Sequence, residues 1–212
     1  MPRYAAILFD LDGTLIDTET IAMASGHAAL ARVGFAVDPG FMQDLVGKDS
    51  VTTGRLLQER LPDADLDAFN AIWRELFDAE IDRRLPLKPG AEELLERIAH
   101  LPRGLVTSSR RHEAVKKLDL TGLTRHFDAV VTFDDVAAPK PAPEPYLLAA
   151  RLLAVPPEAC LVFEDSETGA EAAHRAGCQV VQVPDVQNSE GRWAHHLAET
   201  LLEGALAAGL IV

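Results

Sequence analysis

The chain has 212 residues, of which 48% are hydrophobic and 25% charged, and its formal net charge at pH 7 is −13 with a sequence pI near 4.9. This length allows one well-buried core, or one core with a small second module. The acidic balance makes nucleic acid and anionic membrane surfaces poor partners. An anionic substrate would also be repelled unless local cations or a metal ion corrected the field at its site.

The sequence indicates a soluble, cytoplasmic protein. Residues 1–4 carry no basic segment followed by an apolar run, and no stretch approaches the roughly 18 uninterrupted apolar residues of a membrane span. Cys160 and Cys178 each lie in a short apolar run, where reduced core thiols are expected. No cysteine spacing is that of a zinc site. We expect a monomer, with a dimer left open.

The first predicted element is a buried strand at residues 5–9, a short apolar run that ends at Asp10. Between residues 15 and 85 the patterns are helical, with no convincing strand. Asp17 or Thr18 is a plausible cap for the first of these helices. The predicted helices cover residues 18–33, 39–46, 50–61 and 66–84. Two prolines and a glycine between residues 85 and 90 then mark a linker or a helix start.

Helices and short apolar runs alternate after residue 90. We predict helices at residues 91–99, 111–118, 144–153 and 167–176, strands at 104–106, 129–132, 161–163 and 179–183, and a helical tail from Arg192. This alternation predicts an α/β fold with an open parallel sheet and helices on both faces. Residues 1–15 and 86–212 would form this core, and residues 16–85 an inserted all-helical module.

Polar side chains follow four of the predicted strands. Ligands of such sheets bind outside the carboxyl ends of the strands, so these side chains are the candidate site. Each segment alone also fits a turn or a helix cap. Together, and in this order, they predict a charge-balanced site for phosphate and metal. The segments are Asp10-Leu11-Asp12-Gly13-Thr14, Thr107-Ser108-Ser109, Lys140-Pro141 and Glu164-Asp165-Ser166.

The carboxylates of this site suit phosphoryl transfer. Asp10 ends a buried strand, and a rigidly held carboxylate can attack phosphorus to form an acyl-phosphate. Asp12 reaches the same space if the chain turns at Gly13, and it suits a general acid and base. Glu164 and Asp165 add negative charge that requires a cation, and hard oxygen ligands select Mg²⁺.

The remaining polar groups suit phosphate binding. Lys140 supplies a fixed positive charge, while the Thr107 hydroxyl and the Ser108 backbone amide can donate to phosphoryl oxygens. Ser109 lies in the same segment and is a further candidate. Gly13 and Thr14 complete the candidate phosphate-binding residues.

These segments resemble those of the haloacid dehalogenase-like hydrolases, in particular the β-phosphoglucomutase and phosphatase branch. The resemblance spans residues 9–177 and implies a three-layered, Rossmann-like core with a small helical cap on residues 16–85. It also implies that Asp10 is the nucleophile, Asp12 the acid and base, and Thr107 and Lys140 phosphate ligands. The matching segments are residues 9–15, 106–109, 140–144 and 163–166, with Gly169, Ala172, Ala173 and Gly177.

The same resemblance implies an Mg²⁺ site. Its ligands would be Asp10, the backbone carbonyl of Asp12, and Asp165. Glu164 would bind the ion either directly or through another ligand. Dehalogenase members lack the second aspartate of the first motif, so the presence of Asp12 argues against dehalogenation.

Two departures from the mutase pattern favour simple hydrolysis. Mutases carry a histidine four residues after the threonine that matches Thr18, where this chain has Ala22. They also present a cap arginine for the distal phosphate, at the position that aligns with Ser50.

Three cations are further candidates for substrate contact. Lys48 lies in a predicted cap loop that would face the core site. Arg110 and Arg111 follow the second strand at a helix start, which favours anions. The matching stretch of mutases holds a second anionic group, so we hypothesise a substrate with a second negative group, such as a carboxylate.

The sequence thus favours a magnesium-dependent phosphatase for a small phosphorylated metabolite. Sugar phosphates, sugar-acid phosphates and phosphoglycolate all stay open. One alternative is a mutase or phosphotransferase of the same chemistry. Another is a receiver module that uses a phosphorylated aspartate as a signal, although a receiver needs no helical lid to exclude water.

Overall fold

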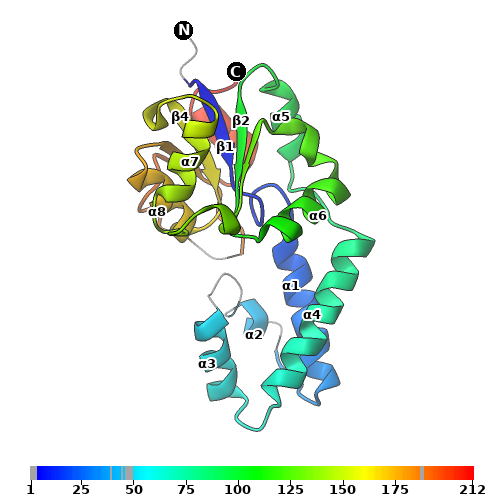
Figure 1. The fold of residues 1–212 in the computed structure, drawn as a ribbon. Coiled ribbons are helices and arrows are strands. Elements are labelled where there is room, and N and C mark those ends of the chain that lie inside the picture. The colour runs from blue at the N-terminus through cyan, green and yellow to red at the C-terminus, as the bar shows by residue number, and fades with distance from the viewer. Residues whose placement is uncertain (1–3, 39, 44, 46–49, 187–188) are drawn as a thin grey trace. The chain divides into compact units, whose positions relative to one another are not determined.

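The computed structural model describes residues 4–38, 40–43, 45, 50–186 and 189–212 (Figure 1). The chain divides into two compact units. One combines Met1–Asp17 with Pro86–Val212, and the other is Thr18–Leu85. The second unit begins two residues after the predicted start of the insertion, residue 16, and ends at its predicted end, residue 85. That the second unit closes over a site stays a prediction.

The first unit is built on a six-stranded sheet in the order β3-β2-β1-β4-β5-β6, in which every neighbouring pair is parallel. The two central strands are short and apolar, except for Glu164 at the end of one of them, as expected where both faces of a parallel sheet are covered. The predicted parallel α/β fold is confirmed. The strands are β1 (Ala6–Phe9), β2 (Arg103–Val106), β3 (Ala129–Val131), β4 (Cys160–Glu164), β5 (Gln179–Gln182) and β6 (His196–Leu197).

Helices cover both faces of this sheet (Figure 1). On one face α7 (Glu144–Leu152) and α8 (Glu167–Arg175) pack against a buried cluster that includes Leu8, Val162 and Tyr146. On the other, the stacked rings of Phe9 and Phe163 lie 5.1 Å apart, centroid to centroid. The remaining helices of the unit are α5 (Ala91–Arg97), α6 (Arg111–Thr121) and α9 (Leu201–Ala207). Short 3₁₀ turns η1 (Leu123–His126), η2 (Phe133–Asp135) and η3 (Pro157–Ala159) complete it.

The strand order places β1 between β2 and β4. The chain first moves outward from β1 through β2 to β3, and then returns to the other side of β1 with β4. The order therefore reverses between β1 and β4, and this reversal is where open α/β sheets bind their ligands.

Among its described residues, the second unit has helices joined by turns and no strand. It contains α1 (Thr18–Arg32), α2 (Gly40–Gln43), α3 (Ser50–Arg60) and α4 (Leu66–Arg83), around a buried cluster that includes Leu30, Met42 and Phe69. Of the predicted helix at 39–46, residues 40–43 form α2 and Leu45 lies in a turn, while residues 39, 44 and 46 lie outside the described residues. The Asp65 side chain caps α4 by accepting from the Ala68 N–H at 2.9 Å.

The predicted helical tail from Arg192 is wrong in its first part. His196–Leu197 forms β6, and the helix α9 begins only at Leu201. The exposed edge of β5 explains the difference, because its backbone groups need partners. The His195 N–H donates to the Val180 carbonyl at 2.8 Å, and the Val180 N–H donates to His195 Nδ1 at 3.0 Å.

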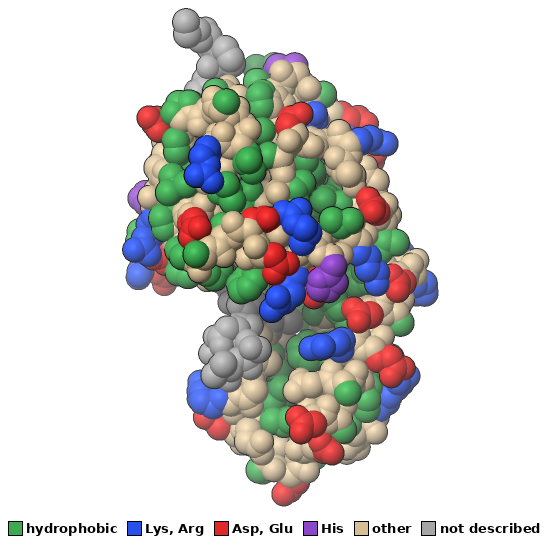
Figure 2. Space-filling model, in the orientation of Figure 1, with side chains coloured by type: hydrophobic (Ala, Val, Ile, Leu, Met, Phe, Trp, Pro, Cys, Tyr) green, Lys and Arg blue, Asp and Glu red, His purple; other side chains and the backbone are tan. Residues whose placement is uncertain are grey.

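Cys160 and Cys178 are buried free thiols in the core, as predicted. On the face drawn in Figure 2, acidic and basic side chains are interspersed. Across the described residues, no helix combines the length and the apolar character that crossing a membrane requires.

Candidate active site

The loop after β1 holds Asp10 at the edge of the sheet. The Asp10 N–H donates to the Phe163 carbonyl at 3.0 Å and so extends the pairing of β1 with β4 by one residue. The chain then turns tightly, with the Gly13 N–H donating to the Ile16 carbonyl at 2.9 Å. Gly13 has φ +83°, and a β-carbon there would lie 2.5 Å from Asp165 Oδ2. Only glycine meets both demands.

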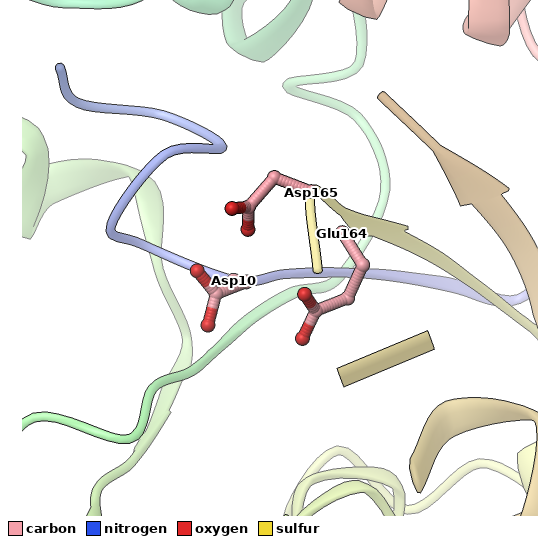
Figure 3. A group of neighbouring side chains, drawn as sticks. All are labelled: Asp10, Glu164 and Asp165. Atoms are coloured by element: carbon pink, nitrogen blue, oxygen red, sulfur yellow. The ribbon is translucent and has the colours of Figure 1, made fainter. Parts of the chain in front are cut away.

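Three carboxylates gather where β1 and β4 end (Figure 3). Asp10, Glu164 and Asp165 each offer an oxygen atom, and these atoms all lie within 4.8 Å of one another. Burial raises the pKa of Asp10 to about 8, although the Lys140 ammonium opposes the shift. Burial, together with the Asp10 charge, also raises the pKa of Asp165 well above its usual value. Buried acids crowded in this way are stabilised in their charged form by a cation.

Lys140 supplies one cation to this cluster. Its Nζ lies 2.6 Å from Asp10 Oδ1 and 2.6 Å from Glu164 Oε1, and it also donates to the Val106 carbonyl at 2.9 Å. Burial by itself lowers the pKa of Lys140, but the two carboxylates outweigh it and raise that pKa above its ordinary value. Lys140 is therefore a fixed positive charge beside Asp10.

Both carboxylate oxygens of Glu164 accept hydrogen bonds. Tyr146 donates its hydroxyl to Oε1 at 2.5 Å, and the Ser166 hydroxyl donates to Oε2 at 3.2 Å. A β-carbon at Gly169 would lie 1.9 Å from Oε1. Tyr146 was not predicted as a site residue, because an aromatic ring on the buried face of α7 looks like ordinary core. Tyr146 lies on α7, directly after the loop that carries Lys140. This short separation in the sequence could have marked it as a candidate site residue.

Asp12 points to a different set of partners. Its Oδ2 accepts from the Ser109 hydroxyl at 2.8 Å, and its Oδ1 lies 2.7 Å from Lys117 Nζ. The nearby Thr107 hydroxyl accepts from the Ser109 N–H at 3.0 Å. The structure thus brings the segment after β2 next to the segment after β1, as the sequence predicted. It also adds Lys117 of α6, which was not among the predicted site residues.

The other candidate ligands are spread around this centre. The Thr14 hydroxyl donates to Asp165 Oδ1 at 3.1 Å, which places Thr14 beside the acidic cluster. Ser108 is exposed in the loop after β2. Arg110 Nη1 lies 3.4 Å from Asp134 Oδ1, and Arg111 pairs with Asp135. Lys48 lies outside the described residues.

The arginines are therefore not an isolated cation pair. Both form ion pairs with carboxylates of η2, which were not predicted because residues 134 and 135 follow a different strand. The Arg110 side chain is still 61% exposed. It keeps surface for a further anion, and its role in substrate binding stays a prediction.

Comparison with known proteins agrees with this geometry. The sequence profile of the haloacid dehalogenase-like hydrolases matches residues 4–177. Fructose-1-phosphate phosphatase YqaB of Escherichia coli K12 is 35% identical over 187 residues, which cover 85% of this chain and 97% of that protein. Phosphorylated carbohydrates phosphatase of Thermotoga maritima is 33% identical over 177 residues, which cover 82% of each chain.

A solved structure matches over the whole length. The crystal structure of a HAD family hydrolase from Deinococcus radiodurans R1, with bound phosphate and sodium, has a TM-score of 0.86 and 28% identity, and the match covers 100% of this chain and 99% of that one. The chain belongs to the haloacid dehalogenase-like hydrolase family. It is an enzyme of the phosphatase type within that family.

The donor set of the acidic cluster fits a metal ion of this family. All three groups offer carboxylate oxygens, the ligands that Mg²⁺ and similar hard cations prefer. Asp10 and Asp165 would hold the ion, with the Asp12 carbonyl as a further ligand. Glu164 already accepts from Lys140, Tyr146 and Ser166, so its carboxylate serves at least to orient Lys140.

Proposed function

We propose that this chain is a magnesium-dependent phosphatase that hydrolyses a small phosphorylated metabolite, of the sugar or sugar-acid phosphate type, through a phosphorylated Asp10. The observation that carries the proposal is the position of Asp10, which ends a central strand beside Lys140 and within a cluster of three carboxylates. Mg²⁺, when bound, neutralises this cluster and lets an anionic carboxylate approach an anionic phosphate.

The first step transfers the phosphoryl group to the protein. An oxygen of the Asp10 carboxylate attacks phosphorus, and the bond from phosphorus to the substrate oxygen breaks. Asp12 gives its proton to that leaving oxygen, which departs as an alcohol. Lys140, fixed 2.6 Å from Asp10, stabilises negative charge on the transferring group.

The second step releases phosphate. Asp12, now a carboxylate, takes a proton from the water that attacks the phosphorus of phosphorylated Asp10. The bond between phosphorus and Asp10 breaks, inorganic phosphate leaves, and both aspartates return to their starting states. Thr107 and the Ser108 N–H, at the end of β2, would donate to phosphoryl oxygens in both steps.

The relatives support a carbohydrate phosphate as substrate. The names of two of them specify fructose 1-phosphate and phosphorylated carbohydrates. We also propose that a second anionic group of the substrate meets Arg110, whose exposed side chain lies at the start of α6. Residues 16–85 would form the small helical cap that the family resemblance implies.

A mutase of the same chemistry is the second candidate. Two observations disfavour it. The position of the mutase histidine is Ala22, on α1, whose carbonyl accepts from Trp73 Nε1 at 2.9 Å within the helical unit. The mutase arginine is replaced by Ser50. Free phosphate, rather than an isomeric sugar phosphate, is the product we expect.

A screen of phosphorylated metabolites, fructose 1-phosphate among them, tests the proposal. Free phosphate is measured with Mg²⁺ and with excess chelator, for the wild type and for Asp10→Asn. We expect release only by the wild type with Mg²⁺, because the replacement keeps the shape of Asp10 but removes the attacking charge. Undiminished turnover by Asp10→Asn, or full activity in chelator, would contradict the mechanism.

A further inference from the structure

Lys117 makes two contacts at the candidate site that the proposed mechanism does not use. Its Nζ lies 2.7 Å from Asp12 Oδ1 and 2.9 Å from Ser109 Oγ. The Ser109 hydroxyl in turn lies 2.8 Å from Asp12 Oδ2. The three side chains form a closed ring, in which each oxygen of the Asp12 carboxylate has its own donor.

The geometry of α6 explains how Lys117 reaches the site. Helical side chains point toward the N-terminus of their helix, and α6 begins at Arg111, directly after the loop that carries Ser109. The long side chain of Lys117 therefore extends back along the helix to that loop. It is only 12% exposed, so it is held in this position rather than solvated.

The two oxygens of Asp12 have chemically different partners. Oδ1 meets an ammonium, which only donates, so that contact keeps Oδ1 an acceptor. Oδ2 meets a hydroxyl, which can rotate and either donate or accept. A proton on Asp12 therefore belongs on Oδ2, where the Ser109 hydroxyl can turn away from it.

We propose that Lys117 is a positioning residue for Asp12, fixing Oδ1 so that Oδ2 is the oxygen that exchanges the proton with the leaving group. This inference rests on the proposed function, in which Asp12 is the acid and base. In the transfer step the proton on Oδ2 moves to the substrate oxygen as the phosphorus–oxygen bond breaks. In the release step Oδ2 regains a proton from the attacking water.

Substrates whose leaving groups differ in basicity distinguish a role in positioning Asp12 from a general effect on the active site or the fold. A positioned acid matters most where the leaving oxygen is basic, as in phenyl phosphate, and little for 4-nitrophenyl phosphate, whose leaving group is stable as an anion. The value of kcat/KM covers the steps up to departure of the leaving group, and is measured for both substrates with Mg²⁺. The variants are Lys117→Met, Lys117→Arg and, as a control with the same loss of charge, Lys116→Met on the exposed side of α6.

We expect Lys117→Met to lower kcat/KM for phenyl phosphate by about 10- to 100-fold, less than the roughly 10²–10⁴-fold that a general acid contributes, because Asp12 itself remains. For 4-nitrophenyl phosphate the loss should stay below about threefold, since little proton transfer is needed. Lys117→Arg, which keeps a charged donor, should recover most of the loss. Lys116→Met should leave both values unchanged.

Equal losses for both substrates, or no loss for either, would overturn the role of Lys117. A fall in melting temperature with equal losses would show that Lys117 only supports the fold. If the wild type releases phosphate from neither substrate, or if Asp10→Asn stays active, the proposed function itself fails. The failures of the two proposals are thus distinguishable.

Discussion

Gly169 of α8 faces Glu164 so closely that a β-carbon at residue 169 would lie 1.9 Å from Oε1 and 2.0 Å from Cδ of that carboxylate. The buried Glu164 carboxylate has no space to withdraw, because Lys140, Tyr146 and Ser166 already surround it. A substitution at Gly169 therefore acts on the active site through Glu164 and Lys140.

We predict that Gly169→Ala lowers the free energy of unfolding by about 1–3 kcal/mol, the usual cost of overpacking. It should also lower kcat, because a displaced Glu164 no longer orients Lys140 beside Asp10. Chemical denaturation and phosphate release measure the two effects. The matched control is Gly54→Ala in α3, where a β-carbon meets no atom within 4 Å. That change should stabilise by about 0.5–1 kcal/mol, as alanine does in helices. A Gly169→Ala protein as stable and active as the wild type would contradict the packing argument.

Asp12→Asn tests the acid and base. We predict that kcat falls by roughly 10²–10⁴-fold, the contribution of one proton-transfer group. Mg²⁺ binding should persist, since the family resemblance assigns the ligand role at this residue to the backbone carbonyl. Phosphate release and calorimetric titration with Mg²⁺ measure the two properties separately. Weaker Mg²⁺ binding, with kcat unchanged at saturating Mg²⁺, would mean that Asp12 is a metal ligand and not the acid.

The pKa of Asp10 makes the stability of the metal-free protein depend on pH. A folded-state pKa raised to about 8, from 3.8, means that the folded protein keeps a proton that the unfolded chain has already lost. The stabilising contribution of this proton is complete below pH 4 and is lost as pH rises toward 8. We predict that Asp10→Asn, which mimics the protonated form, melts higher than the wild type in chelator, by a margin that grows from pH 5 to pH 8.

Melting curves in chelator across this pH range measure that margin. Asp63→Asn, at an exposed position, is the control for the change in net charge and should show no such growth. Excess Mg²⁺ should reduce the margin, because a bound cation stabilises the charged carboxylate. A margin that stays constant with pH would mean that Asp10 is ionised throughout in the folded protein.

Arg110→Ala tests the second anionic group of the substrate. One charge-assisted contact contributes about 1.5–3 kcal/mol. We therefore predict that KM for phosphoglycolate rises by at least about 10-fold. KM for 2-hydroxyethyl phosphate, in which an alcohol replaces the carboxylate, should change much less. Equal responses to both substrates would assign Arg110 to the ion pair with Asp134 and to surface charge alone.

The parallel sheet and the positions of the polar segments were predictable from the sequence. Apolar runs such as residues 5–9 and 161–163 mark buried strands, and local patterns of this length depend little on the rest of the chain. Because parallel strands end at one edge, segments far apart in sequence could be assigned to one site. On this basis Asp10, Lys140, Glu164 and Asp165 were predicted together, and the structure brings them together.

Three features emerged only from the tertiary structure. Strand β6 replaces a predicted stretch of helix, because the edge of β5 offers backbone partners that no local pattern reveals. The hydroxyl of Tyr146 reaches Glu164, although its ring looks like ordinary core. Lys117 reaches Asp12 across 105 positions of sequence, although a lysine on an amphipathic helix usually points to solvent.

The physical reason is the range of the interactions. Strand and helix patterns, and the residue types needed for phosphate chemistry, are properties of short segments, and the sequence alone determined them. Which donor meets which carboxylate oxygen depends on the packing of α6 and α7 against the strand ends. That packing is settled by contacts between residues distant in sequence, and only the tertiary structure decided it.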